Sequence, residues 1–164
     1  EKSAYTIDYA DLYRKGYRGV IFDIDNTLVP HGVPATKEAA AFFASLRETG
    51  FSTCLLSNNQ KPRVAPFADA VGSIYIENAH KPSVKNYQEA CRRMGIKEEQ
   101  AVFVGDQLFT DVYGAKRTGL YNILTEPINP KEEIQIVLKR YLEHIVLFFY
   151  ERDLARGRIT KKNS

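Results

Sequence analysis

The chain has few cysteines, no long apolar run and little net charge, and each shortage excludes a class of protein. Two cysteines in 164 residues cannot form the framework of a disulfide-rich domain. Both Cys54 and Cys91 lie in apolar patterns, as expected of buried free thiols in a reducing compartment. No apolar run reaches the ~18–20 residues of a membrane-spanning helix. A net charge of +3 does not indicate nucleic-acid binding. These features predict a cytoplasmic globular protein.

Short apolar runs alternate with helical patterns along the chain, without internal repeats or low-complexity linkers. The runs predict strands over Arg18–Phe22, Ser52–Ser57, Ser73–Glu77, Ala101–Gly105 and Tyr121–Thr125. The helical patterns cover 36–49, Arg63–Val71, Ser83–Met94, Thr110–Lys116 and Lys131–Tyr150. This alternation predicts an α/β protein with a Rossmann-like, three-layer α/β/α sandwich around a mainly parallel five-stranded sheet.

Two carboxylates, Asp23 and Asp25, follow the apolar run 19–22. Residues i and i+2 of a strand point the same way. The pair would therefore share one face at the carboxyl end of the strand, where open α/β sheets place ligands. Close carboxylates repel one another unless a cation or proton lies between them. Alone, this pattern is more typical of a solvated turn.

Polar residues also follow the second and third predicted strands. The Ser57 hydroxyl and the backbone amides that follow it suit a phosphate oxygen, although Ser57-Asn58-Asn59 taken alone is more typical of an ordinary turn. Lys81 lies between a strand and a helix, where its charge could neutralise a phosphoryl group. A single lysine is more often a surface group.

The fourth strand ends in Gly105-Asp106, with Asp111 five residues later. Asp106 would meet the two aspartates of the neighbouring strand end, and three convergent carboxylates suit Mg²⁺. Gly105 permits close backbone approach. Asp111 could belong to the site or cap the following helix.

Together these segments resemble the four motifs of haloacid dehalogenase-like (HAD) phosphatases. The matching residues are Asp23-x-Asp25-x-Thr27, Ser57, Lys81 and Gly105-Asp106 with Asp111. The longer strings around them look most like the YqeG family (subfamily IIIA), which is similar to mitochondrial phosphatidylglycerophosphate phosphatases. The resemblance covers residues 18 to 125, and it predicts that residues 1–130 are a HAD-like catalytic domain. Residues 131–164 would add a C-terminal helix and basic tail to the same domain.

The resemblance implies a role for each motif residue. Asp23 would be the nucleophile that forms an aspartyl-phosphate, and Asp25 the general acid and base. Lys81 would assist as a catalytic and phosphate-binding residue. Phosphate would contact Thr27, Ser57, Asn58 and Lys81. Mg²⁺ would be held by Asp23, Asp106 and the Asp25 carbonyl, with Asp111 holding a ligand water or supporting Lys81.

The spacing of the motifs leaves no room for a cap domain. Segment 29–35 is a short loop, and the stretch between Ser57 and Lys81 holds one short helix and one strand. An open site suits a large phosphorylated substrate, and we expect an anionic phospholipid such as phosphatidylglycerophosphate. The alternatives are a phosphoprotein or nucleotide phosphatase, and a non-catalytic HAD-fold module that binds protein or RNA. Lys61 and Arg63 could bind a second anionic group, or they are ordinary helix-start residues.

The end of the chain is basic and partly apolar. Residues 139–164 contain seven basic and three acidic side chains, an excess of four positive charges. A helix over Lys131–Tyr150 with this tail could contact an anionic membrane, pack on the core or form a homodimer. We expect a cytoplasmic protein with peripheral contact at the inner membrane face, and no nucleic-acid partner.

Overall fold

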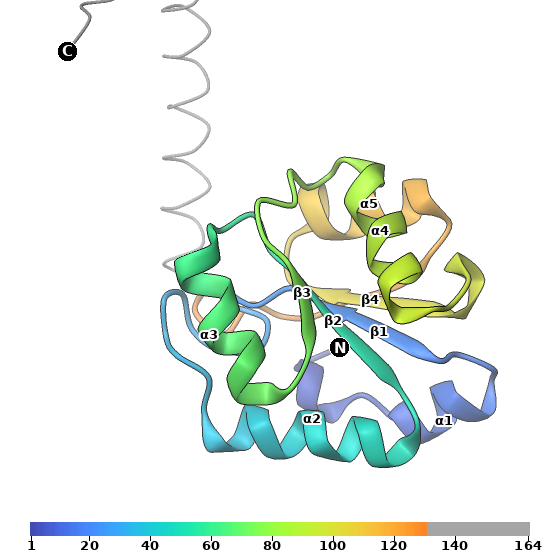
Figure 1. Ribbon diagram of the computed structural model, residues 1–164, viewed down its shortest axis with the longest axis horizontal. Coiled ribbons are helices and arrows are strands. Elements are labelled where there is room, and N and C mark those ends of the chain that lie inside the picture. The colour runs from blue at the N-terminus through green and yellow to red at the C-terminus, as the bar shows by residue number, and fades with distance from the viewer. Residues whose placement is uncertain (131–164) are drawn as a thin grey trace, which may run out of the picture. The chain divides into compact units, whose positions relative to one another are not determined.

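The computed structural model describes residues 1–130, whose parallel strands form one sheet. Figure 1 shows this sheet between two layers of helices. The strand order is β3-β2-β1-β4-β5, and every neighbouring pair is parallel. The strands are β1 (Gly19–Phe22), β2 (Ser52–Leu56), β3 (Ile74–Ile76), β4 (Ala101–Gly105) and β5 (Tyr121–Leu124). The central strand β1 therefore has β2 on one side and β4 on the other, and all three carboxyl ends meet at one edge.

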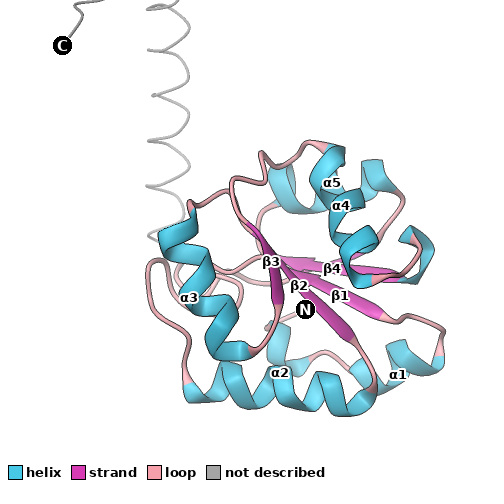
Figure 2. Cartoon of the chain, viewed as in Figure 1, coloured by secondary structure: helices cyan, strands magenta, loops and turns pink. Residues whose placement is uncertain are grey.

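Helices cover both faces of this sheet (Figure 2). One face carries α1 (Tyr9–Arg14), α2 (Lys37–Thr49) and α3 (Lys61–Val71), and the other carries α4 (Val84–Met94) and α5 (Tyr113–Thr118). Three short helical turns complete the described elements, at Ala4–Thr6, Glu98–Gln100 and Leu108–Val112. The predicted three-layer α/β/α sandwich is confirmed.

Alternate residues of the central strands face opposite layers, because side chains of a strand alternate across the sheet. Val20 and Phe22 of β1 belong to the core under α1, α2 and α3, whereas Ile21 belongs to the core under α4 and α5. All three are fully buried. This two-sided burial explains why β1 is a continuous apolar run. Cys54 and Cys91 are buried free thiols, as predicted.

The predicted strands are confirmed to within a residue or two at their ends, but the helices differ more. The helix predicted over Arg63–Val71 is α3, which begins at Lys61. The helix expected over Thr110–Lys116 is instead a π-helical turn, Leu108–Val112, followed by α5. The sequence patterns did not predict α1, although Asp8 caps it by accepting a hydrogen bond from the Asp11 amide at 2.8 Å.

Within residues 1–130, neither of the two expected insertion positions holds an additional domain. The chain from β1 to α2 is a loop without a helix, and only α3 lies between β2 and β3. The predicted helix over Lys131–Tyr150 and the basic tail lie outside the described residues. Among the described helices, none combines the length and apolarity needed to cross a membrane.

Candidate active site

The predicted site residues lie in the segments that leave the carboxyl ends of β1, β2, β3 and β4. The chain turns sharply after β1, where the Leu28 and Val29 amides donate to the Ile24 carbonyl at 2.9 and 3.3 Å. Asn26 takes a positive φ of 63° in this turn, a conformation that asparagine adopts more readily than most residues. The turn leaves Asp23 and Asp25 nearly buried, at 6% and 8% exposure.

Lys81 joins two carboxylates that are far apart in the sequence. Its Nζ donates to Oδ1 of Asp23 and to Oδ1 of Asp111, both at 2.6 Å. The lysine side chain is 4% exposed and that of Asp111 is completely buried. Asp111 Oδ2 also accepts a hydrogen bond from the Gln107 amide at 3.1 Å. Of the two roles open for Asp111, the contacts favour the one in which it supports Lys81.

Burial and charge change the proton affinities of this cluster. Burial, helped by the neighbouring Asp111 and opposed by Lys81, raises the pKa of Asp23 to about 7. Burial alone would lower the pKa of Lys81, but Asp111 and Asp23 raise it above its ordinary value. The lysine is therefore a permanent cation, whereas Asp23 is ready to accept a proton whenever no further cation is present.

Three carboxylates of the site could share a metal ion. Asp23, Asp106 and Asp111 each offer an oxygen, and these oxygens lie within 4.8 Å of one another. Asp106 Oδ1 accepts a hydrogen bond from the Thr27 hydroxyl at 3.0 Å. A Cβ at Gly105 would collide with the Asp111 carboxylate. The glycine is thus required for the approach of Asp111 to the end of β4.

The motif after β2 organises the loop that carries Lys81. Asn58 Oδ1 accepts a hydrogen bond from the Lys81 amide at 2.7 Å, and Asn58 Nδ2 lies 3.5 Å from the Lys81 carbonyl. Ser57 is buried, and its Oγ accepts a hydrogen bond from the Asn59 amide at 3.1 Å. The contacts of Asn58 are with the lysine backbone, so it positions Lys81 in addition to any contact with phosphate.

Asp25 has partners that the sequence patterns did not assign to it. Its Oδ1 accepts hydrogen bonds from Arg63 Nη2 at 2.8 Å and the Gly32 amide at 2.9 Å, and its Oδ2 accepts one from Asn59 Nδ2 at 2.5 Å. His31 Nδ1 lies 3.9 Å from the same carboxylate. The sequence patterns predict Arg63 either as a ligand for a second anionic group or as an ordinary helix-start residue, and neither prediction includes its contact with Asp25. Asn59 lies two residues after Ser57 in the sequence, and this position could have indicated that it contacts the site.

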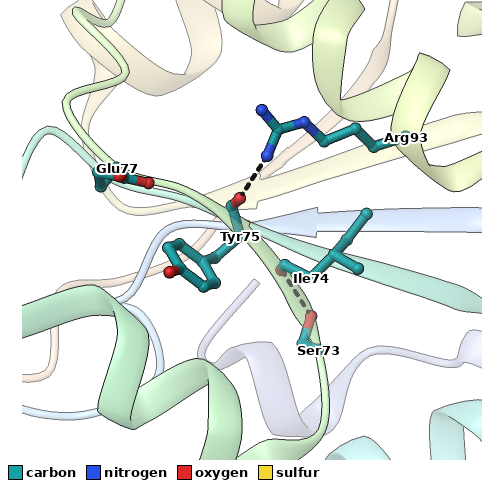
Figure 3. A pocket seen from close by; sticks show the side chains of 5 residues that line it. All are labelled: Ser73, Ile74, Tyr75, Glu77 and Arg93. Atoms are coloured by element: carbon teal, nitrogen blue, oxygen red, sulfur yellow. Dashed lines mark hydrogen bonds between the residues drawn. The ribbon is translucent and has the colours of Figure 1, made fainter. Parts of the chain in front are cut away.

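A separate pocket of about 670 Å³ lies along β3 at the edge of the sheet (Figure 3). It is lined by Ser73, Ile74, Tyr75, Glu77 and Arg93. Arg93 Nη1 donates to the Tyr75 carbonyl at 3.0 Å. None of the predicted site residues lines this pocket. The chemistry is therefore concentrated in the carboxylate cluster and not in this hollow.

Fold and site together describe an α/β enzyme domain with an acidic, lysine-containing site at the carboxyl edge of a parallel sheet. A model of the haloacid dehalogenase-like hydrolase family matches residues 31–119. A probable phosphatase of Bacillus subtilis, YqeG, is 34% identical over 152 residues, covering 92% of this chain and 88% of the relative. The chain therefore belongs to the haloacid dehalogenase-like hydrolases, as a phosphatase of that family.

Two further comparisons bear on substrate and fold. A chloroplastic and mitochondrial phosphatidylglycerophosphate phosphatase of Arabidopsis thaliana is 29% identical over 161 residues. The match covers 92% of this chain but 46% of the relative. An uncharacterised protein of Listeria monocytogenes has a crystal structure that matches with a TM-score of 0.56 at 20% identity, over 70% of this chain and 80% of that one. This last similarity concerns the fold.

Proposed function

We propose that the protein is a Mg²⁺-dependent phosphomonoesterase that works through an aspartyl-phosphate. The observation that carries the proposal is the buried group of Asp23, Lys81 and Asp111, which two 2.6 Å contacts join. A carboxylate oxygen of Asp106 lies within 4.8 Å of those of Asp23 and Asp111. Phosphoryl transfer needs positioning and neutralisation of charge more than covalent assistance. A cation and a fixed lysine around one nucleophilic carboxylate meet that need.

The donor set fits Mg²⁺. The three candidate ligands are all carboxylates, and magnesium prefers oxygen ligands. Three carboxylates against one lysine leave an excess of two negative charges when all are ionised, which a divalent cation would balance. Asp23 and Asp106 would hold the ion together with the Asp25 backbone carbonyl, whereas Asp111, which is paired with Lys81, would contact the ion only through a ligand water. The ion would supply Lewis-acid stabilisation of charge on the phosphoryl oxygens.

The chain's own residues then have defined tasks. The Asp23 carboxylate oxygen attacks phosphorus, the bond to the ester oxygen breaks, and Asp25 gives that oxygen a proton. Asp25 next takes a proton from water, whose oxygen attacks phosphorus and releases inorganic phosphate and free Asp23. Lys81 keeps its charge throughout. Thr27 contacts Asp106 and Asn58 contacts the Lys81 backbone; we assign these two residues and Ser57 to binding of the phosphoryl oxygens.

For the substrate we propose a phospholipid with a terminal phosphate, such as phosphatidylglycerophosphate. Support comes from the activity named for the Arabidopsis relative and from the lack of an inserted domain in residues 1–130. A site without a cap can accept a headgroup that remains attached to a large body. The relative is more than twice as long as the matched region, so its activity is a guide to this chain's substrate.

The test is phosphate release by the wild type and Asp23→Asn, with and without Mg²⁺. The panel contains phosphatidylglycerophosphate, a phosphopeptide, nucleotides and p-nitrophenyl phosphate. We expect hydrolysis that requires both Mg²⁺ and Asp23, with the lipid preferred. Asn keeps the shape of Asp but is a far weaker nucleophile, so full activity in the variant would disprove the assignment. Preference for a peptide or nucleotide would keep the mechanism and replace the substrate.

A further inference from the structure

An exposed apolar surface lies next to the carboxylate cluster. Leu108, Phe109 and Tyr113 are 56%, 81% and 54% exposed, although each is a large apolar or aromatic side chain. All three fall within six residues of the chain, in the π-helical turn and the first turn of α5. Isolated exposed apolar residues are ordinary, but a cluster beside a functional site indicates an interaction surface.

The turn is held in place from its inner side, so these side chains cannot simply fold inward. The Asp111 and Val112 amides donate to the Gln107 carbonyl at 2.9 and 3.2 Å. The Tyr87 hydroxyl donates to the Thr110 carbonyl at 2.7 Å. Asp111 itself is fully buried against Lys81. Asp111 is therefore committed to the active site and the turn is fixed from within the fold, while Leu108, Phe109 and Tyr113 are left to solvent.

The charge around this turn has one sign. Lys116 and Arg117 are exposed on α5, and the Arg117 guanidinium lies 5.5 Å from the ring centre of Tyr113. The only acidic residue in 107–119 is Asp111, which has no exposure. The exposed surface of this segment thus combines aromatic, aliphatic and basic groups. That combination is typical of segments that lie in the headgroup region of anionic membranes.

We propose that Leu108, Phe109, Tyr113, Lys116 and Arg117, here called the interfacial turn, dock the protein on an anionic lipid bilayer. The apolar side chains enter the region between headgroups and acyl chains, and the two basic side chains contact lipid phosphates. A protein partner is a less suitable occupant, because the segment 107–119 exposes no acidic group for pairing with one. Asp106 precedes the turn and Asp111 lies within it, so docking brings the carboxylate cluster to the level of the headgroups. The idea that docking presents lipid substrate to the site rests on the proposed function, whereas the binding to the bilayer does not.

The chain has no tryptophan, which allows a site-specific test with all 164 residues present. Phe109→Trp places a single fluorophore on the interfacial turn. Tyr121→Trp is the matched control, because Tyr121 is 50% exposed at the amino end of β5, whereas the interfacial turn follows the carboxyl end of β4. The probe is a vesicle of phosphatidylglycerol and phosphatidylcholine, compared with one of phosphatidylcholine alone. A second set of vesicles carries bromine on the acyl chains as a contact quencher.

With phosphatidylglycerol vesicles, we expect the indole emission of the Phe109→Trp variant to shift to shorter wavelength and to be quenched by the brominated chains. The emission of the Tyr121→Trp variant should show neither change. Phe109→Ser should weaken vesicle binding by about tenfold or more, since a buried phenylalanine contributes at least ~1.4 kcal/mol. Tyr121→Ser should not. Phe109→Ser should still hydrolyse p-nitrophenyl phosphate, because the exposed Phe109 side chain is not part of the carboxylate cluster.

Three results would overturn the proposal. One is an unchanged emission spectrum of the Phe109→Trp variant while the protein still sediments with vesicles, which would place membrane contact elsewhere in the chain. Another is no binding to either vesicle, which would leave a protein partner as the occupant. The third is an equal response to vesicles of phosphatidylcholine alone, which would show that Lys116 and Arg117 do not contribute to binding. Phosphatidylglycerol has no phosphomonoester, so these readouts are independent of whether the protein hydrolyses the lipid panel.

Discussion

Replacing Lys81 by methionine should destabilise the metal-free protein more than any exposed lysine would. The lysine side chain is 4% exposed and makes two 2.6 Å contacts with buried carboxylates. Methionine fills a similar volume but leaves Asp23 and Asp111 facing one another without a cation. Breaking a buried ion pair by removing one partner costs roughly 3–5 kcal/mol.

The length of the domain and the protonation of Asp23 set the size of this effect. For a domain of this length, ~1 kcal/mol corresponds to about 2–4 °C, so the melting temperature should fall by roughly 6–20 °C. Protonation of Asp23 relieves the repulsion, and the pKa of Asp23, about 7 in the presence of Lys81, should rise further once the lysine that lowers it is removed. The wild type therefore stops losing stability near pH 7, whereas the variant continues to lose it at higher pH. The fall in melting temperature should therefore approach roughly 6 °C at pH 5 and roughly 20 °C at pH 8. Mg²⁺ should restore part of the stability by binding the uncompensated negative charge.

The assay is thermal unfolding followed by circular dichroism, in EDTA and in Mg²⁺, at both pH values. Lys85→Met is the matched control, because Lys85 lies close by in the sequence, on α4, and is exposed. If Lys81→Met melts within about 2 °C of Lys85→Met at pH 8 in EDTA, Lys81 does not hold the carboxylates together. A pH-independent loss of stability would equally refute the electrostatic explanation and point to simple packing.

Three other predictions follow from the same geometry. Gly105→Ala should weaken Mg²⁺ binding measured by calorimetry, because the new methyl group collides with Asp111. Gly114→Ala is the control, since its methyl group collides with Tyr87 instead. Equal weakening of Mg²⁺ binding in both variants would point to general destabilisation. Arg63→Gln should lower kcat about tenfold by releasing Asp25, with exposed Lys61→Gln as the control that must remain near wild type. The pKa of Asp23 lies above its ordinary value, so the metal-free protein should lose stability as pH rises from about 4 through 7. Asp23→Asn should flatten that slope, and an unchanged slope would exclude Asp23 as its source.

Much of the fold could be predicted from local patterns because each pattern has a local cause. The run Val20-Ile21-Phe22 is apolar on every residue since both faces of β1 are covered. Thr36 and Gly50 marked the ends of α2 because capping depends on a few neighbouring residues. The π-helical turn was missed because its geometry depends on contacts made by Thr110 and Asp111 with distant elements.

By itself, the sequence determined which chemical groups leave the carboxyl ends of the strands. Asp23, Ser57, Lys81 and Asp106 follow strand-like runs, and parallel strands bring their ends to one edge. Only the tertiary structure decided how these groups pair. Lys81 and Arg63 have the same charge and both lie near carboxylates, yet one joins Asp23 to Asp111 and the other contacts Asp25. That choice depends on the placement of α3 and of the loop after β3, which long-range packing sets and no local pattern records.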